Sequence, residues 1–175
     1  MTDGKRLSRR QVMSAATALG FAGSSAAKVA AAAEPQPVAD PGTRFVFEVR
    51  ADIAPAIVIG QSAYGLRRLI PITGGRFSGP GLKGEVVPGG GDYQLVRPDG
   101  VTAVEARYTL KTDDGALIYV NNQGLIASGA AVRTAPQFEA PVGPYDWLNK
   151  SLFIGTLDGS HAAQGYVVLR FFQVT

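Results

Sequence analysis

The only histidine of the chain, His161, directly follows Ser160 and lies three residues after Asp158. Serine, histidine and aspartate are the residue types of a hydrolytic triad, in which the histidine accepts the proton of the serine hydroxyl. All three fall within the short segment Asp158-Gly159-Ser160-His161-Ala162, which is typical of a solvent-facing turn. A triad histidine is held by a buried aspartate, so this pattern favours a surface histidine without a catalytic role.

The stretch from 101 to 111 offers a second kind of chemistry. Arg107 and Glu105 share one face of its apolar–polar alternation, and on a solvent face they would form an ordinary ion pair. Facing an interior, Arg107 would instead anchor an anion or a carbonyl, with Asp92 as its carboxylate partner. Tyr108, on the other face, could place a phenol in a pocket as a donor or an acid catalyst. The alternation alone leaves both orientations open.

Glycines are densest from 71 to 84 and again from 88 to 92. A phosphate-binding loop would need a strand before it, a helix after it and a Gly-Lys-Ser/Thr ending. Lys83 is followed by Gly84, and a strand pattern follows in place of a helix. The segment therefore predicts turns and bulges that bend strands around a barrel, and no nucleotide site.

The segment 141–150 (Pro-Val-Gly-Pro-Tyr-Asp-Trp-Leu-Asn-Lys) combines two aromatic residues with amide and carboxylate side chains between prolines. Two interpretations stay open. The segment either closes over a barrel mouth as a ligand lid, or Trp147 and Leu148 seal one barrel end as part of the core.

The elements that position these residues are short strands. Turn signals such as Pro98-Asp99-Gly100, Asp113-Asp114-Gly115 and Asn122-Gln123-Gly124 separate them. The predicted strand-like runs are 44–50, 57–59, 66–72, 85–87, 93–96, 101–111, 116–121, 125–132, 151–157 and 165–174. Eight to ten short strands joined by tight turns predict an all-β antiparallel meander, closed as an up-and-down β-barrel in preference to a sandwich. A barrel of this size has room for side chains or one small ligand.

The N-terminal residues predict a cleaved export signal. Arg9 and Arg10 precede an Ala/Gly-rich stretch, and the alanines 31–33 match a signal-peptidase site. The paired arginines indicate the twin-arginine type, hence a periplasmic or secreted protein. The stretch is too weakly apolar for a stable membrane anchor. We expect a signal at 1–33, a linker at 34–43 and one barrel domain at 44–175.

Composition narrows the function classes once the signal is set aside. The chain has 17 Lys/Arg and 14 Asp/Glu; five of the basic and one of the acidic residues lie in 1–33, so 12 basic and 13 acidic residues remain. This balance gives no basic surface for nucleic acid. There is no cysteine, so disulfides and thiolate ligands are excluded. We expect no metal and no cofactor.

Several motifs, in order, resemble one known family. They are Gly74-Gly75-Arg76-Phe77-x-Gly79-Pro80-x-Leu82-x-Gly84, Pro88-Gly89-Gly90-x-Asp92, Ala106-Arg107-Tyr108, Asp113-Asp114-Gly115 and Tyr145-x-Trp147-Leu148-Asn149. Over about 44–174 the chain resembles the DUF3237 (UPF0311) family, which has no known function. The resemblance implies a barrel similar to lipocalin-like and allene-oxide-cyclase-like barrels. It implies a ligand-binding set of Arg76, Asp92, Arg107, Tyr108, Asp114, Tyr119, Asn122, Trp147 and Asn149. Asp114 and Asn122 could equally serve as turn residues.

Three hypotheses follow. The first is an exported protein that binds an apolar or aromatic small molecule bearing a polar group. The second is a cofactor-free isomerase, cyclase or lyase, with Asp92 or Asp114 as base and Tyr108 or Arg107 stabilising an oxyanion. The third is a structural or oligomeric envelope protein with a fully packed barrel. The expected partner is a small molecule, with a homo-oligomer as an open alternative.

Overall fold

The computed structural model describes residues 39–175, and the predicted export signal and residues 34–38 of the predicted linker lie outside this range. The described residues form nine strands and two short 3-10 segments. The strands are β1 (Thr43–Ile53), β2 (Ile57–Ser62), β3 (Gly65–Gly79), β4 (Leu82–Val96), β5 (Thr102–Thr112), β6 (Leu117–Ile126), β7 (Arg133–Glu139), β8 (Phe153–Asp158) and β9 (Tyr166–Val174). The 3-10 segments are η1 (Asp146–Lys150) and η2 (Ala162–Gln164).

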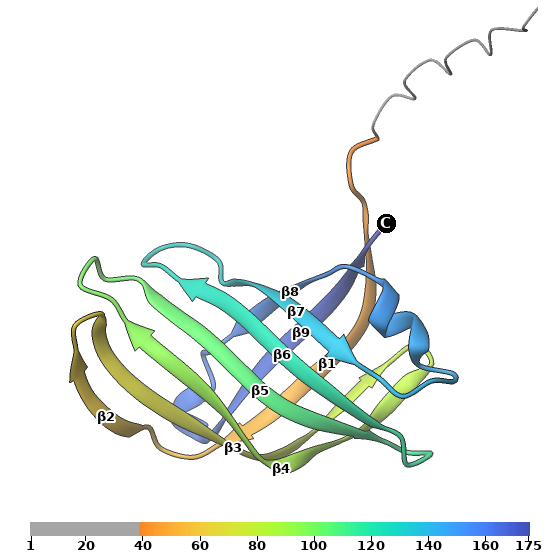
Figure 1. The fold of residues 1–175 in the computed structure, drawn as a ribbon, viewed down its shortest axis with the longest axis horizontal. Helices are drawn as coiled ribbons and strands as arrows, with labels where there is room; N and C mark the ends of the chain where they lie inside the picture. Colours follow the sequence, from red (N-terminus) through yellow and green to blue (C-terminus); the bar gives the residue numbers. More distant parts are fainter. Residues whose placement is uncertain (1–38) are drawn as a thin grey trace, which may run out of the picture. The chain divides into compact units, whose positions relative to one another are not determined.

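Eight of these strands close into an antiparallel barrel (Figure 1). From β3 to β9 each strand pairs with the next, and β1 pairs with both β9 and β3 to complete the ring. The predicted all-β, up-and-down barrel is therefore confirmed. Strand β2 stands outside the ring and, within 39–175, pairs with β3 alone. No helix in this range is long and apolar enough to span a membrane.

Glycines in β3 and β4 bend the strands as the glycine-rich pattern predicts. The β3–β4 register shifts between Ile72 and Arg76, and the β4–β5 register shifts between Val87 and Gly91. Gly75 has φ +132°, and a Cβ there would lie 2.1 Å from the carbonyl oxygen of Arg50 on β1. Only glycine permits both this backbone conformation and the close approach of β3 to β1.

The predicted turn Asn122-Gln123-Gly124 is wrong, because these residues lie inside β6. Gly124 is needed for packing: a Cβ there would lie 2.7 Å from Thr134 Cγ2 on the neighbouring strand. The turn comes later, after Ile126, and the predicted strand 125–132 is replaced by β7. The glycine signals close contact between strands here, which sequence alone does not distinguish from a turn.

One half of the barrel is filled by aromatic side chains. Phe47 has no exposed surface, and its ring centroid lies 5.7, 5.6 and 5.1 Å from those of Phe77, Phe138 and Phe171. Such tilted and edge-to-face contacts stabilise a core beyond the area they bury. The segment η1 adds Leu148, which is buried in the same cluster. We call this part the packed half.

Candidate functional site

The other half of the barrel encloses a cavity of about 420 Å³. It lies where β1 ends and β5 begins. Most of the apolar side chains there are small or aliphatic, in contrast to the rings of the packed half. Ala51 and Ala106 each contribute only a methyl group to the wall. The larger apolar wall residues are Ile53, Ile72, Leu157, Val167 and Leu169.

Ala106 is the centre of the polar side of the cavity. Asp92 on β4 lies directly opposite it on one side, and Asn122 on β6 lies directly opposite it on the other. Tyr108 follows two residues later on the same face of β5. Directly opposed residues have Cβ atoms about 5 Å apart, so the short Ala106 side chain leaves space between three functional groups.

The carboxyl group of Asp92 is held in place by two hydrogen-bond donors, one of which is itself held by Arg68. Gln94 donates from Nε2 to Oδ2 at 2.6 Å, and the backbone amide of Glu105 donates to Oδ1 at 2.9 Å. Arg68 Nε donates in turn to Gln94 Oε1 at 2.8 Å. Burial nevertheless raises the pKa of Asp92, and these hydrogen bonds and the charge of Arg68 offset it only in part. The group is thereby disposed to carry and release a proton.

Three other polar side chains reach the cavity from almost fully buried positions. Tyr108, Asn122 and Thr134 are 3, 2 and 5% exposed, and all line the cavity. Within the described residues, Tyr108 Oη, Asn122 Oδ1 and Thr134 Oγ1 have no hydrogen-bond partner. Burial raises the pKa of Tyr108, so its side chain is a neutral phenol. We call these three side chains the polar floor.

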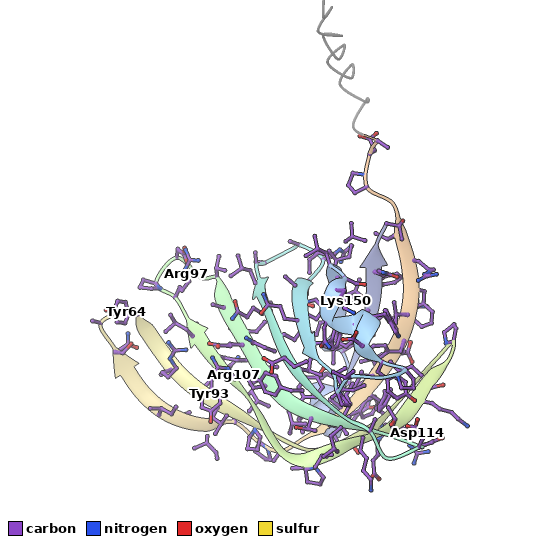
Figure 2. All side chains as sticks on the ribbon, turned by 45° about the vertical axis from the view of Figure 1, so that its right-hand side comes forward. Tyr64, Tyr93, Arg97, Arg107, Asp114 and Lys150 are labelled. Atoms are coloured by element: carbon purple, nitrogen blue, oxygen red, sulfur yellow. The ribbon has the colours of Figure 1, made fainter. Side chains whose placement is uncertain are left out.

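The structure decides which face of β5 is inside. Tyr108 and Ala106 point into the barrel, while Arg107 and Glu105 form an ion pair on the outer face. Figure 2 shows Arg107 on the wall of the barrel, near Tyr93. Tyr119 pairs with Thr109 on that same outer face. The solvent-facing interpretation of the polar stripe therefore holds, and Arg107 and Tyr119 lie outside the cavity.

Two more predicted site residues lie on the outside at the packed half. Arg76 lines a surface depression together with Lys83 and Asp113. Asp114 sits at the β5–β6 turn (Figure 2), where it accepts hydrogen bonds from the hydroxyl groups of Thr112 and Tyr145. These bonds lower the pKa of Asp114, as expected of a turn residue and unlike the raised pKa of Asp92.

The segment 141–150 seals the packed half and lies outside the cavity wall. Trp147 packs against Phe153 with ring centroids 6.0 Å apart. Asn149 bridges the backbone of Ala140, accepting from its N–H at 2.7 Å and donating to its carbonyl at 2.9 Å. Of the two interpretations of this segment, the structure supports the core plug. Trp147 and Asn149 hold that plug in place.

His161 forms no triad. Its ring stacks on Tyr166 at 4.7 Å, and its Nδ1 lies 3.3 Å from Gln164 Oε1. Asp158 accepts instead from the backbone amide of Ser160 at 2.9 Å. In the part of the chain that the structure describes, no group of three or more His, Cys, Asp or Glu side chains could hold a metal ion.

Of the predicted site residues, the structure thus brings Asp92, Tyr108 and Asn122 together in one cavity. Sequence reasoning missed Arg68, Gln94 and Thr134, which line the same cavity. Thr134 alternates with Pro136 and Phe138, so it could have been placed on an interior face. Arg68 and Gln94 are directly paired across β3 and β4, a signal that needs the register of that hairpin.

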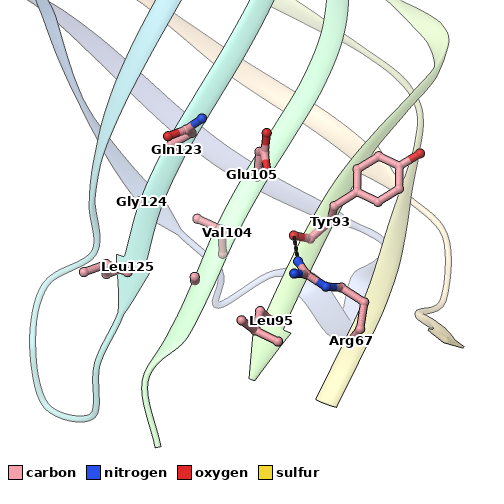
Figure 3. A pocket seen from close by; sticks show the side chains of 9 residues that line it. Arg67, Tyr93, Leu95, Val104, Glu105, Gln123, Gly124 and Leu125 are labelled. Atoms are coloured by element: carbon pink, nitrogen blue, oxygen red, sulfur yellow. Dashed lines mark hydrogen bonds between the residues drawn. The ribbon is translucent and has the colours of Figure 1, made fainter. Parts of the chain in front are cut away.

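A second depression lies on the outer surface of β3 to β6 (Figure 3). Its lining includes Arg67, Tyr93 and Glu105. Arg67 donates to the carbonyl oxygen of Tyr93 at 3.3 Å, drawn as the dashed line in Figure 3. The depression is open to solvent and lacks the buried, unpartnered polar groups of the interior. The interior cavity is the stronger candidate site.

Comparisons with known proteins agree with this architecture. Residues 41–174 match the model of a family described as "Protein of unknown function (DUF3237)". A UPF0311 protein of Rhodopseudomonas palustris (strain TIE-1) is 38% identical over 131 residues, covering 65% of this chain and 86% of that protein. Hydroalkoxylation enzyme phnH of Penicillium herquei is 32% identical over 116 residues, covering 66% and 74%. The crystal structure of a conserved protein of unknown function from R. palustris has a TM-score of 0.72 at 35% identity, covering 79% of this chain and all of that one.

Proposed function

This chain belongs to the DUF3237 family of proteins of unknown function, and we propose that its barrel binds a small, largely apolar molecule and transfers a proton within it through Asp92. The protein would then be an isomerase, cyclase or lyase that works without a cofactor. The observation that carries the proposal is a carboxyl group of raised pKa in the wall of a mostly apolar cavity. A general acid or base works best when its pKa lies near the working pH.

The surroundings of Asp92 support this role. Gln94 and the Glu105 amide fix both carboxyl oxygens, so the group is oriented before a substrate arrives. Tyr108, on the same face of the next strand, supplies a neutral phenol that can stabilise developing negative charge. The cavity volume suits a molecule of one to three rings.

The relative from Penicillium herquei suggests a specific reaction class. Hydroalkoxylation adds the oxygen and the hydrogen of an alcohol O–H bond to the two carbons of a double bond. When both groups belong to one molecule, the O–H bond and the π bond break, and one C–O and one C–H bond form. Asp92 donates its proton to one alkene carbon, the hydroxyl oxygen bonds to the other, and the carboxylate accepts the hydroxyl proton. The product is an isomer of the substrate, so the step balances without an oxidant or co-reactant.

A probe of proton transfer in apolar pockets tests the proposal. 5-Nitrobenzisoxazole opens when a base removes its ring proton and the N–O bond breaks. We expect the protein to accelerate this opening, with a rate that rises with pH until Asp92 is fully ionised. Asp92→Asn should abolish the acceleration. Asp113→Asn should retain it, because Asp113 is an exposed carboxylate paired with Lys83 outside the cavity.

Two results would separate the enzyme from a simple binding protein. A wild-type rate equal to that of Asp92→Asn at every pH would overturn the proposed proton transfer. If the probe still bound the wild type, and Ala106→Leu prevented its binding, the apolar lining would favour the small-molecule carrier instead. Ala106→Leu fills the space between the polar groups and leaves them in place.

We also propose that the protein is exported through its twin-arginine signal. The support is the sequence: Arg9-Arg10, the Ala/Gly-rich stretch and the alanines before Glu34. Expression of the full chain in a bacterium with this export system should give a periplasmic form that lacks 33 residues by mass spectrometry. Replacing both arginines by lysine should leave the uncleaved chain in the cytoplasm. Cleaved, periplasmic protein from that variant would contradict the proposal.

A further inference from the structure

The polar floor has an unmet hydrogen-bonding capacity. Tyr108 Oη, Asn122 Oδ1 and Thr134 Oγ1 are buried without a partner among residues 39–175. An unpaired buried polar group costs about 1–3 kcal/mol, so most such groups in native proteins find a partner. Four such atoms occur among residues 39–175; three belong to side chains that line one cavity, and the fourth, Asn121 Oδ1, lies outside its lining. The three in the cavity wall indicate that their partner is a molecule bound there.

The sheet register brings the three groups toward one point. Tyr108 lies opposite Val120, two residues before Asn122 on β6. Thr134 lies opposite Gly124, two residues after Asn122. Asn122 is thus the diagonal neighbour of both other residues, at a separation that long side chains can bridge. Thr134 also has glycines on both sides, since a Cβ at Gly155 would lie 2.2 Å from its Oγ1.

The donor and acceptor atoms of the polar floor limit which chemical group of a ligand can bind there. The hydroxyl groups of Tyr108 and Thr134 can each donate, while Asn122 Oδ1 can only accept. A ligand hydroxyl group both donates and accepts, so it can satisfy all three at once. A carbonyl or ether oxygen only accepts, and it would leave Asn122 Oδ1 unpaired. If the Asn122 amide is turned by 180°, a hydroxyl group still pairs with it.

The charge of the surroundings excludes ionised ligand groups from the floor. Tyr108, Asn122 and Thr134 are all neutral, and burial raises the pKa of the Tyr108 phenol. A carboxylate buried among them would have no cation beside it, because the cavity-lining Arg68 stands on β3, separated by β4 and β5 from Asn122 on β6. The opposite wall is aliphatic and includes Leu157 and Leu169. The ligand body that fits this wall is apolar.

We infer that the polar floor is a binding site for an uncharged hydroxyl group, and that the ligand is a phenol or alcohol that enters hydroxyl first with its apolar body against β1, β8 and β9. This inference rests on the proposed function, since it names the substrate class of the same cavity. It assigns three positioning residues to the cavity in addition to Asp92, and it predicts that the hydroxyl end of the substrate lies deepest in the barrel.

A matched pair of probes tests the inference. 1-Naphthol can donate and accept a hydrogen bond, whereas 1-methoxynaphthalene can only accept and has a nearly equal apolar body. Titration calorimetry should give 1-naphthol an affinity about tenfold higher, the fold-change expected from one buried hydrogen bond. Tyr108→Phe, Thr134→Val and Asn122→Leu should each reduce this preference toward one.

Asn121→Leu is the control, because Asn121 is the next residue on β6 and lies outside the cavity lining. It should leave the preference at about tenfold. Tyr108→Phe removes only a hydroxyl group, and Thr134→Val replaces one by a methyl group. These two variants should therefore fold even if Asn122→Leu does not. Circular dichroism and the melting temperature check this.

The outcomes distinguish the floor from the proposed function. Equal affinity for the two probes, with both excluded by Ala106→Leu, would overturn the hydroxyl site and leave a binding cavity in place. Absence of binding by either probe would overturn the hydroxyl site, and the proposed function would fall with it only if 5-nitrobenzisoxazole is not opened either. A naphthol preference that survives in all three floor variants would also overturn the inference. Loss of proton transfer in Asp92→Asn, measured separately, bears on the proposed function alone.

Discussion

The two halves of this barrel share the same strands and differ in what those strands carry inward. In the packed half, Phe47, Phe138 and Phe171 interlock at ring distances of 5.1–5.6 Å. In the half with the cavity, which we call the hollow half, β1 carries Ala51 and β5 carries Ala106, and a cavity of about 420 Å³ remains. One ring of hydrogen-bonded strands thus supports a core and a site. Side-chain volume, rather than backbone, separates them.

The division also explains how the hollow half can tolerate unpaired polar groups. Tyr108 and Asn122 carry a cost for being buried without partners. The aromatic cluster next to them supplies apolar burial that offsets it, since each fully buried Phe contributes about 1.5–3 kcal/mol. Six substitutions, in four experiments, test this difference between the two halves.

The largest effect is expected in the packed half. Phe47→Ala removes a ring with no exposed surface that contacts three other rings, so the free energy of unfolding should fall by about 3–5 kcal/mol. Urea denaturation measures it. Leu157→Ala in the cavity wall should cost only about 1 kcal/mol, because Leu157 is half-buried and borders existing space. Equal losses in the two variants would contradict the division.

Enlarging side chains should produce the next largest contrast. Val120→Phe overfills a site with no exposed surface and should destabilise the protein by about 1–3 kcal/mol. Ala106→Leu extends into the cavity and should change the free energy of unfolding by less than about 1 kcal/mol. The same urea titrations compare them. A large loss for Ala106→Leu would mean that the hollow half is as tightly constrained as the packed one.

The ionisation of Asp92 gives a smaller, pH-dependent effect. Because burial raises its pKa in the folded state, the folded protein binds this proton more tightly than the unfolded chain. The contribution of Asp92 to stability is therefore fully present below its unfolded-state pKa and is lost as pH rises through the folded-state pKa. The stability of Asp92→Asn relative to wild type should rise from about pH 4 and level off above the folded-state pKa, by about 1.4 kcal/mol for each unit by which burial raises that pKa. If the stability of Asp92→Asn relative to wild type fell with rising pH, the pKa of Asp92 would be lowered in the folded state, contrary to this prediction.

The smallest effect is expected outside the barrel. Arg107→Ala removes an exposed ion pair with Glu105, and such pairs contribute little because solvent screens them. Neither the free energy of unfolding nor the affinity for 1-naphthol should change measurably. A clear loss of binding would mean that Arg107 reaches the ligand and that the outer face takes part in the site.

Much of the fold could be predicted from the sequence. The alternation around Tyr108 predicts a strand and its two faces, and the structure places Val104, Tyr108 and Leu110 inside. Turn residues such as Asp113-Asp114-Gly115 mark the β5–β6 hairpin. The family resemblance drawn from the ordered motifs is confirmed by the match over residues 41–174.

The candidate site could be predicted only in part from the sequence, because it depends on the register between strands and on the closure of the barrel. Asp92 follows the register shift between β4 and β5 that precedes Gly91, and it faces the cavity. The apolar–polar alternation of the sequence does not indicate where such a shift occurs. Asn122 and Gly124 have the residue types of a turn, yet β7 pairs alongside them. Six other predicted site residues have suitable chemistry but lie outside the cavity. On outer faces are Arg76, Arg107 and Tyr119; at a turn is Asp114; and in the plug are Trp147 and Asn149. The export signal stays a prediction.

The placement of β2 outside the ring has a kinetic consequence. Its backbone is hydrogen-bonded along one side, to β3, while the segment 54–56 that leads into it lines the cavity. A strand with a single neighbour unpairs at a fraction of the free energy needed to open the ring. Strand β2 can therefore unpair locally while the eight-stranded ring stays closed. The backbone amides of this six-residue strand are then expected to exchange hydrogen faster than those of the ring, independently of global unfolding.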